Sequence, residues 1–413
     1  MSNFERRLDA RLVVSVAAVG VMSFTGVVVE TALNIAFPAL MKEFGVTTAV
    51  VQWGTTAYLL VLSAIMPISS FLNRRFRNKT LFLAAMAVFV AGTAVCAAAP
   101  HFILLVVGRI LQGIGAGIAL PLMFNIVLQH APVGKLGVMM GFATLIIAIA
   151  PAVGPSFGGF LVEAYGWRSI FLVLLPFLGL SLVLGALTVR QARNVEKVGF
   201  SPVQFLLVAA GFTALVVAAN AASEGTWTSP KTLGLFALAF ALLAGFTWIS
   251  RRSDAPLLRV RIFADRTYSL SLAYAVLIQA AVLALGYLIP YFAQVAKSTG
   301  SFAAGCLLLP GCVIGAILTP FGGRLLDRFG AEGSAVRLAF IYAFFPICQG
   351  LSLSNSMTHG LRSLPEELQA DGNAAFNTVQ QLGGAVGTAV AAAIVNSAQA
   401  ASSGDVVAGT TAG

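Results

Sequence analysis

Charged side chains are scarce in this sequence of 413 residues: Asp, Glu, Lys and Arg make up 10% of it, whereas 58% of the residues are hydrophobic. This balance, with a mean hydropathy of +0.91, excludes an ordinary soluble domain. A membrane-spanning helix needs about 20 mainly apolar residues, and many runs qualify. The apolar residues do not follow the two-residue period of a barrel strand, which argues against a membrane β-barrel. We therefore expect an all-α polytopic membrane protein.

Residues and motifs typical of enzyme sites are also missing. The chain has three histidines, at loop or span ends, and four cysteines, in apolar runs without a CxxC pair. It contains no HExxH, GxSxG or Walker sequence, so metal hydrolysis, acyl transfer and ATP coupling are not expected. Gly113, Gly115 and Gly117 lie mid-run with no strand before them, which favours helix packing over a dinucleotide loop. We expect no enzyme activity, no cofactor and no metal site.

The apolar runs that are candidate spans cover 12–40, 50–72, 80–99, 102–129, 137–161, 169–189, 203–221, 232–250, 268–295, 302–322, 337–358 and 373–396. The first is too long for a signal peptide and lacks a small-residue cleavage site, so no cleavable signal is expected.

The net charge of +10 is distributed in a way that sets orientation. Most Lys and Arg residues fall in every second loop, beginning with the N-terminal segment, and few fall in the intervening loops (Lys42, Arg168, Lys231, Lys297). Basic loops stay on the cytoplasmic side of a membrane. The pattern predicts a cytoplasmic N-terminus in a plasma membrane, and no nucleic-acid partner.

Short sequence pairs recur along the chain. Gln-Gly occurs at 112–113 and 349–350, and Val-Gly at 153–154 and 386–387. Parallel repeats are one common build of secondary transporters. The two runs between 203 and 250 have no counterpart, so they are interpreted as an insert.

Three parts follow from this repeat: an N-terminal half of six spans at 1–200, a two-span insert with basic linkers at 201–266, and a C-terminal half of about four spans at 267–413. The second half lacks about one span's length near 345, and the chain ends in a small, polar tail. Relative to a complete repeat, we infer an internal deletion and a missing last helix.

Several motifs resemble those of the major facilitator superfamily, and in particular its fourteen-span drug/proton antiporters of the EmrB/QacA type. The motifs are Glu30-Thr-Ala-Leu-Asn34-Ile-Ala-Phe-Pro38 in the first run, Arg109-x-x-Gln112-Gly113 in the fourth, Gly154-Pro155-x-x-Gly158-Gly159 in the fifth, Trp167-Arg168-Ser169-Ile170-Phe171 before the sixth, and Gly323-x-Leu-x-Asp327-Arg328-x-Gly330 after the tenth.

The resemblance implies two six-helix-type halves and proton-coupled export of small, lipophilic, often cationic compounds by alternating access. It also implies conformational roles for Gly154, Pro155, Gly158 and Gly159, and for Asp327 with Arg328. From spacing alone, the alternative for the glycines is helix packing. The first-half loop departs from the family, because Arg74 stands at the expected Asp and Arg77 at the expected Gly. A charge lock there is therefore doubtful.

Glu30 and Arg109 are the candidates for proton coupling. An ionisable side chain within a span is costly, so it is a functional hypothesis by default. At 1.5 Å per residue, Glu30 lies about 12 Å and Arg109 about 10 Å from the outer ends of their runs. Burial disfavours charge on Glu30, whereas a nearby Arg109 favours it. A change that separates and rejoins them would couple proton uptake and release to transport; the alternative is a static ion pair.

The candidate substrate contacts are polar or aromatic residues in apolar surroundings: Asn34, Trp53, Tyr58, Gln112, Asn125, Gln279, Tyr291, Asn377 and Gln381. Such groups suit bulky apolar or cationic molecules, but they also form interfacial belts and interhelical hydrogen bonds. The expected partners are small-molecule substrates, protons and lipid, bound by a monomer. An exporter or facilitator of a single metabolite, and a transport-inactive truncated form, remain the alternatives.

Overall fold

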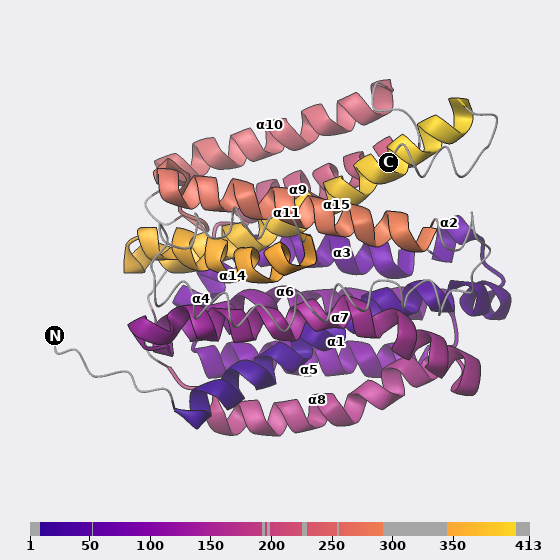
Figure 1. Ribbon diagram of the computed structural model, residues 1–413, viewed down its shortest axis with the longest axis horizontal. Helices are drawn as coiled ribbons and strands as arrows, with labels where there is room; N and C mark the ends of the chain where they lie inside the picture. Colours follow the sequence, from indigo (N-terminus) through magenta and orange to yellow (C-terminus); the bar gives the residue numbers. More distant parts are fainter. Residues whose placement is uncertain are drawn as a thin grey trace.

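A computed structural model describes residues 9–51, 53–191, 195, 199–224, 229–253, 256–291 and 345–401, and within these ranges it contains helices and no strand (Figure 1). The first six spans are formed by α1 (Ala10–Phe44), α3 (Trp53–Ile65) with α4 (Ser69–Arg75), α5 (Asn78–Ala98), α6 (Phe102–His130), α7 (Leu136–Tyr165) and α8 (Arg168–Thr188). The short helix α2 (Thr48–Val51) precedes α3, and a 3-10 turn, Met66–Ile68, joins α3 to α4.

The later elements are α9 (Pro202–Glu224), α10 (Pro230–Arg252), α11 (Arg266–Tyr291), α14 (Phe345–Ser363) and α15 (Gln369–Ala401), with 3-10 turns at Val133–Lys135, Val260–Ala264 and Glu366–Leu368. Eight of the described helices are long and apolar enough to cross a membrane, and α7 is a ninth if its two arms form one span. These arms, Leu136–Pro151 and Ser156–Tyr165, meet at 45°. The sequence predicts a kink here, because proline removes a helix hydrogen bond and clashes with the preceding turn.

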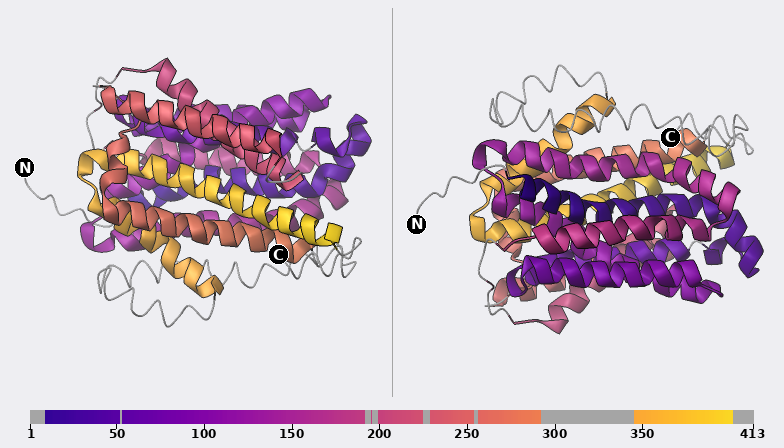
Figure 2. Two further views of the ribbon diagram at one scale, coloured as in Figure 1. Left: turned by 90° about the horizontal axis from the view of Figure 1, so that it is seen from above. Right: turned by 90° about the horizontal axis from the view of Figure 1, so that it is seen from below.

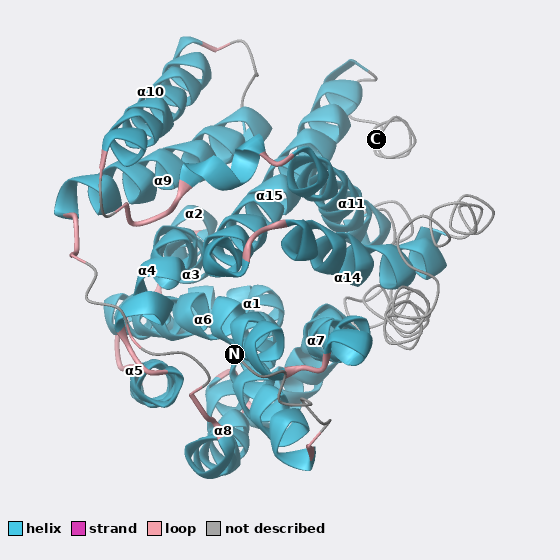
Figure 3. Ribbon diagram, turned by 90° about the vertical axis from the view of Figure 1, so that its left-hand side faces the viewer, coloured by secondary structure: helices cyan, strands magenta, loops and turns pink. Residues whose placement is uncertain are grey.

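The helices pack in two similar groups. In the first, α1 packs against α6 and α7; in the second, α11 packs against α14 and α15. Figure 2 shows α11 and α15 running side by side. The Gln-Gly and Val-Gly pairs fall on α6 and α7 in one group and on α14 and α15 in the other. The helix pair α9–α10 lies outside both groups, with α9 against α3 and α15 (Figure 3).

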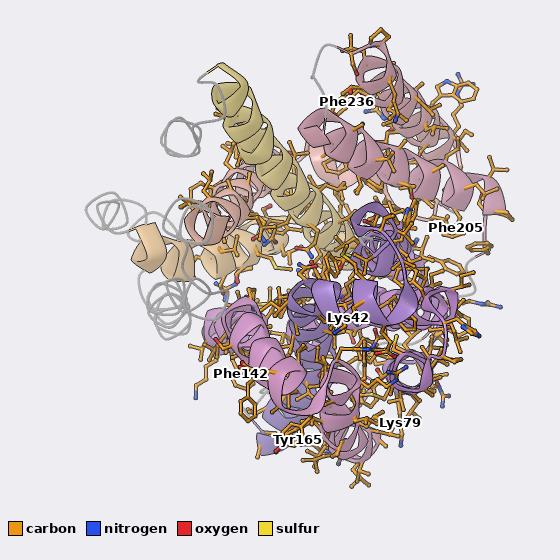
Figure 4. The ribbon with its side chains drawn as sticks, turned by 90° about the vertical axis from the view of Figure 1, so that its right-hand side faces the viewer. Lys42, Lys79, Phe142, Tyr165, Phe205 and Phe236 are labelled. Atoms are coloured by element: carbon orange, nitrogen blue, oxygen red, sulfur yellow. The ribbon has the colours of Figure 1, made fainter. Side chains whose placement is uncertain are left out.

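Two ends of the bundle are distinguished by their polar contacts. At the end that we call inner, Asn78 Nδ2 donates to Gln129 Oε1 at 2.8 Å and to the Arg190 carbonyl at 3.3 Å, and Arg259 Nη1 donates to the Glu367 carbonyl at 3.2 Å. The loop at 364–368 lies at this same end. Figure 4 is viewed from the opposite, outer end, where Lys42 lies in the last turn of α1.

Candidate functional site

Arg109 is the buried centre of the site. Its side chain has 0% exposure on α6. Nε donates to the Gly54 carbonyl of α3 at 2.9 Å, and Nη1 donates to Gln112 Oε1 at 2.7 Å. The third nitrogen, Nη2, has no hydrogen-bond partner among the described residues. A buried donor without a partner costs about 1–3 kcal/mol, so this nitrogen is a strained point of the site.

Gln112 extends the network from α6 to α5. Its Nε2 donates to Thr93 Oγ1 on α5 at 2.9 Å, and Thr93 Oγ1 donates to the Phe89 carbonyl at 2.8 Å. The Gln112 side chain is fully buried. This geometry favours the interhelical hydrogen bond that was the alternative to a substrate contact, and it fixes the direction of the Arg109 guanidinium.

Tyr58 lies between Arg109 and α1. The Arg109 guanidinium carbon sits 4.1 Å from the centre of the Tyr58 ring, within the range of a cation–π interaction. The ring is 1% exposed, so in this structure Tyr58 supports Arg109 and does not face a substrate path. Its hydroxyl is directed at Gly26, where a methyl group would come within 2.6 Å of Oη. Gly26 therefore permits the close approach of Tyr58 to the α1 backbone.

Glu30 follows Gly26 by one turn on the same face of α1. Its side chain is half-buried. The charges of Arg109 and Glu30 interact, and Tyr58 interacts with both. In the described part of the chain, however, no ion pair joins Glu30 to Arg109. The structure thus places the two residues predicted at similar depth near enough for their charges to interact, and the described residues include no direct partner of the carboxylate.

Asn34 and Trp53 extend this surface toward the outer end. Asn34 is exposed one turn beyond Glu30, and its Oδ1 accepts a hydrogen bond from Thr55 of α3 at 3.0 Å. Trp53, at the start of α3, is 53% exposed. Exposed side chains of α1 and α3 thus lie between the outer end and Glu30.

The remaining candidate contacts are scattered. Asn125 on α6 is buried, and its Nδ2 has no partner among the described residues. Asn377 on α15 is buried and donates to Asn373 Oδ1 at 2.7 Å. Gln279 on α11 accepts from Gln380 at 3.2 Å, and its neighbour Gln381 is half-buried. The side chain of Tyr291 lies outside the described residues, and so do Asp327 and Arg328.

The glycines of α7 pack against α1. A methyl group at Gly158 would lie 2.6 Å from Ala32 Cβ, and one at Gly154 would clash with Thr31. Gly159 meets nothing within 4 Å. Pro155 lies at the bend, and its side chain is not described. Gly387 on α15 repeats the seam, because a methyl group there would lie 2.5 Å from Ala280 Cα of α11. The contacts agree with the packing interpretation, and the conformational roles stay a prediction.

A polar cluster at the inner end was not predicted. Asp371, in the first turn of α15, has 0% exposure. Its Oδ1 accepts from Ser70 Oγ of α4 at 2.6 Å and from the Arg259 N–H at 3.1 Å. Arg74 Nη2 and Arg259 Nε each lie 4.0 Å from its carboxylate. Arg74, which stands where the family has an acid, thus finds an acid on another helix. The signal in the sequence was an Asp at the start of the last span.

The outer end carries a second cluster, within the first six spans. Trp167 Nε1 donates to Glu43 Oε2 at 2.7 Å, Arg168 forms an ion pair with the same carboxylate, and Arg168 Nη2 donates to the Ala99 carbonyl at 2.8 Å. The Trp167 hydrogen bond, followed by the hydrogen bond and charge of Arg168, lowers the pKa of Glu43 from its ordinary value. The Trp-Arg motif thus fastens the ends of α1, α5 and α8.

Comparisons with known proteins agree with this architecture. The family model of the Major Facilitator Superfamily matches residues 19–388. A lincomycin resistance protein of Listeria monocytogenes is 33% identical over 401 residues, covering 92% of this chain and 85% of its own length. A multidrug resistance protein B homologue of Mycobacterium tuberculosis is 28% identical, covering 94% and 77%.

Two solved structures are similar at low identity and bear on the fold alone. The human organic anion transporter MFSD10 has a TM-score of 0.65 at 13% identity, with 97% of this chain and 96% of that chain covered. The proton:xylose symporter XylE has a TM-score of 0.61 at 12% identity, with 93% and 88% covered.

Proposed function

Because this chain belongs to the major facilitator superfamily and is a multi-pass membrane transporter, we propose that it exports small, lipophilic, often cationic compounds in exchange for protons. Relatives named for lincomycin and multidrug resistance support the substrate class. We further propose a cytoplasmic N-terminus in a plasma membrane and action as a monomer. The division into two halves and a two-span insert belongs to the same proposal.

One observation carries the proton-coupling part: Glu30 is a half-buried carboxylate near Arg109, and no ion pair joins the two among the described residues. A carboxylate held in a tight, permanent ion pair has a low proton affinity, because the opposite charge favours its ionised form. Glu30 instead is half-buried, one turn from the exposed Asn34, and we propose that a proton or a cationic substrate reaches it from that side. Proton and cation then compete for one carboxylate, and this competition is the basis of exchange.

Arg109 affects this competition by changing the proton affinity of Glu30. Its position is fixed by Gly54, Gln112 and Tyr58, so its charge acts on Glu30 from a constant direction. A shift of α1 against α6 would change the Glu30–Arg109 separation and, with it, the proton affinity of Glu30. Because the interaction energy of two charges varies inversely with distance and is strong where water is excluded, a small displacement has a large effect.

Alternating access would use the contacts between the two helix groups. The hydrogen bonds that join α15 to α4 and α6 lie toward the inner end: Asp371 accepts from Ser70, and Asn373 Nδ2 donates to the Pro121 carbonyl at 2.7 Å. Together with the exposed Asn34 and Trp53, they support an outward-open arrangement. Inward opening would require these bonds to break.

Inside-out membrane vesicles that accumulate ethidium provide the test. We expect uptake driven by an imposed pH gradient, its loss in Glu30→Gln, and its partial retention in Glu30→Asp. Glu163→Gln is the matched control, since Glu163 is an exposed carboxylate at the outer end of α7. Full uptake by Glu30→Gln would refute the role of Glu30. Movement of one metabolite without proton flux would favour the single-metabolite alternative, and a folded protein silent with every compound would favour an inactive form.

A further inference from the structure

The helix pair α9–α10 is connected to the inner cluster by residues 256–259 of the segment that follows it. Arg74 Nη2 donates to the Pro256 carbonyl at 2.7 Å and to the Leu257 carbonyl at 3.2 Å. The next contact along the chain is the Arg259 N–H, which donates to Asp371. Within four consecutive residues, the chain thus bonds Arg74 of α4 on one side, through 256 and 257, and Asp371 of α15 on the other, through 259. We call residues 256–259 the bridge.

The helix pair itself holds the bridge in place. Gln204, near the start of α9, accepts from the Leu257 N–H at 2.9 Å through its side-chain oxygen. Ser250, near the end of α10, donates to the Leu258 carbonyl at 2.6 Å. Both side chains are buried. Neighbouring residues of the bridge are therefore anchored by different helices of the pair, which fixes both its position and its orientation.

Apolar packing strengthens the same connection. Leu257 is 1% exposed and packs with Ile68 and Phe71 next to α4, with Phe205 of α9 against the same cluster. Burying a leucine side chain is favourable, so the bridge is held by apolar packing as well as by its polar contacts. Phe205 on α9 and Phe236 on α10 mark the helix pair at the edge of the bundle in Figure 4.

We propose that the helix pair α9–α10 controls inner closing: by holding the bridge between Arg74 and Asp371, it positions the two charges and stabilises the closed inner end. The physical reason is the placement of the charges. Arg74 and Asp371 approach only to 4.0 Å, and the bridge gives Arg74 Nη2 two carbonyl acceptors and Asp371 Oδ1 one N–H donor. Arg74 Nε and Asp371 Oδ2 have no hydrogen-bond partner among the described residues, so the pair depends on these three bonds. A buried ion pair is favourable only when such additional hydrogen bonds satisfy it. Without the bridge, the buried charges would lack those bonds and closing would be weaker.

This proposal rests on the alternating access proposed above, and it is tested by a distance that needs no transport. Nitroxide labels at Arg77 and Glu367, both exposed at the inner end, report the separation of α5 and α15 in the full chain, after replacement of the native cysteines. The test variants are Gln204→Met and Ser250→Ala, alone and combined. They remove the two hydrogen bonds that hold the bridge to α9 and α10, and they change neither Arg74 nor Asp371.

We expect these anchor variants to enlarge the long-distance population about tenfold relative to the short one, equivalent to about 1.4 kcal/mol. Ser250→Thr keeps the hydroxyl, so its distance distribution should stay close to that of the unmodified protein and show little of the shift caused by Ser250→Ala. Thr247→Val on α10 is the control, because Thr247 bonds only within its own helix in the described contacts. An unchanged distance distribution in the anchor variants would overturn the proposal, whatever the outcome of the ethidium test.

If the variants at Gln204 and Ser250 fold poorly, a comparison of two substitutions at Arg259 tests the bridge instead. Arg259→Ala removes the side chain and keeps the N–H that Asp371 accepts. Arg259→Pro also removes the N–H, at a φ of −77° that proline can adopt. We expect a larger long-distance population in Arg259→Pro than in Arg259→Ala. Equal populations in the two variants would show that the N–H to Asp371 does not contribute to closing.

Discussion

Neutralising Asp371 should open the inner end of the bundle. The carboxylate is fully buried and faces Arg74, whose side chain is 7% exposed, at 4.0 Å, and Arg259 at the same distance. Asp371→Asn keeps an oxygen that can accept from Ser70 and from the Arg259 N–H, so it removes charge more than hydrogen bonding. At an effective dielectric of about 20, one unit-charge pair at this distance is worth about 4 kcal/mol before desolvation is subtracted.

Desolvation reduces this figure. Breaking a buried pair by removing one partner typically costs about 3–5 kcal/mol, and part of that cost here is relieved because opening lets water reach Arg74. We therefore expect Asp371→Asn to favour the open form by about 2 kcal/mol, which is roughly a thirtyfold change in the closed-to-open ratio. Asp371→Ala, which also removes the acceptor, should have a larger effect.

The assay is the nitroxide distance between positions 77 and 367, combined with a double-mutant cycle. Arg74→Met should act in the same direction as Asp371→Asn, and the double variant should cost less than the sum, because the second change no longer leaves an unpaired buried charge. Strict additivity, or a distance distribution unaffected by Asp371→Ala, would refute a closing role for this ion pair.

Three further changes have defined outcomes. Tyr58→Phe should keep most pH-driven ethidium uptake, because the ring that supports Arg109 remains. Tyr58→Leu should lower this uptake about tenfold, since a cation–π contact in a dry site is worth about 1–2 kcal/mol. Equal uptake by the two variants would show that the ring does not support Arg109. Gly158→Ala should lower the melting temperature in detergent, since its methyl would meet α1 at 2.6 Å, and Gly159→Ala, facing open space, should not. Because the folded pKa of Glu43 is lowered, its stabilisation is present above the ordinary value of 4.5 and is lost as the pH falls through the folded value; Glu43→Gln should flatten the melting temperature between pH 6 and 3, and an unaltered pH slope would count against the outer cluster.

Hydropathy and charge were sufficient to predict most of the spans, because a membrane helix is defined by a local property of about 20 residues. Most of the described helices begin and end within a few residues of the predicted runs: 102–129 is α6, Phe102–His130, and 169–189 is α8, Arg168–Thr188. The run predicted at 337–358 is described only from 345, as α14, which extends to Ser363, and the run at 302–322 lies outside the described residues. Depth counting also predicted that Glu30 and Arg109 lie at similar depth, since both distances are measured along single helices from the same membrane surface. Their charges interact in the structure, but no ion pair joins them among the described residues, and their role in proton coupling stays a prediction.

Side-chain direction could not be predicted in the same way. Gln112 and Tyr58 are polar groups in apolar runs, and the sequence does not tell a residue that faces a path from one that binds a neighbouring helix. In the structure Gln112 bonds Thr93 and Tyr58 covers Arg109. The rotation of each helix about its axis decides this, and that rotation depends on packing against several others.

The inner cluster was missed for a related reason. Ser70 and Asp371 are separated by 301 positions in the sequence. The substitution of Arg74 for the family's acid suggested that a charge lock was absent, because only the loop itself was considered. The compensating acid lies on α15, and its second partner lies in the segment after the helix pair. Contacts between residues so far apart in the sequence become visible only when the helices are placed next to one another.

Proton release on substrate binding measures the coupling at Glu30 without any transport step. Purified protein in unbuffered detergent solution at neutral pH is mixed with tetraphenylphosphonium, and a pH indicator follows the released protons. If Glu30 is shared by proton and cation, the protein should release protons, Glu163→Gln should release as many, and Glu30→Gln should release none while its folding is intact. Undiminished proton release from Glu30→Gln would contradict proton exchange at this carboxylate.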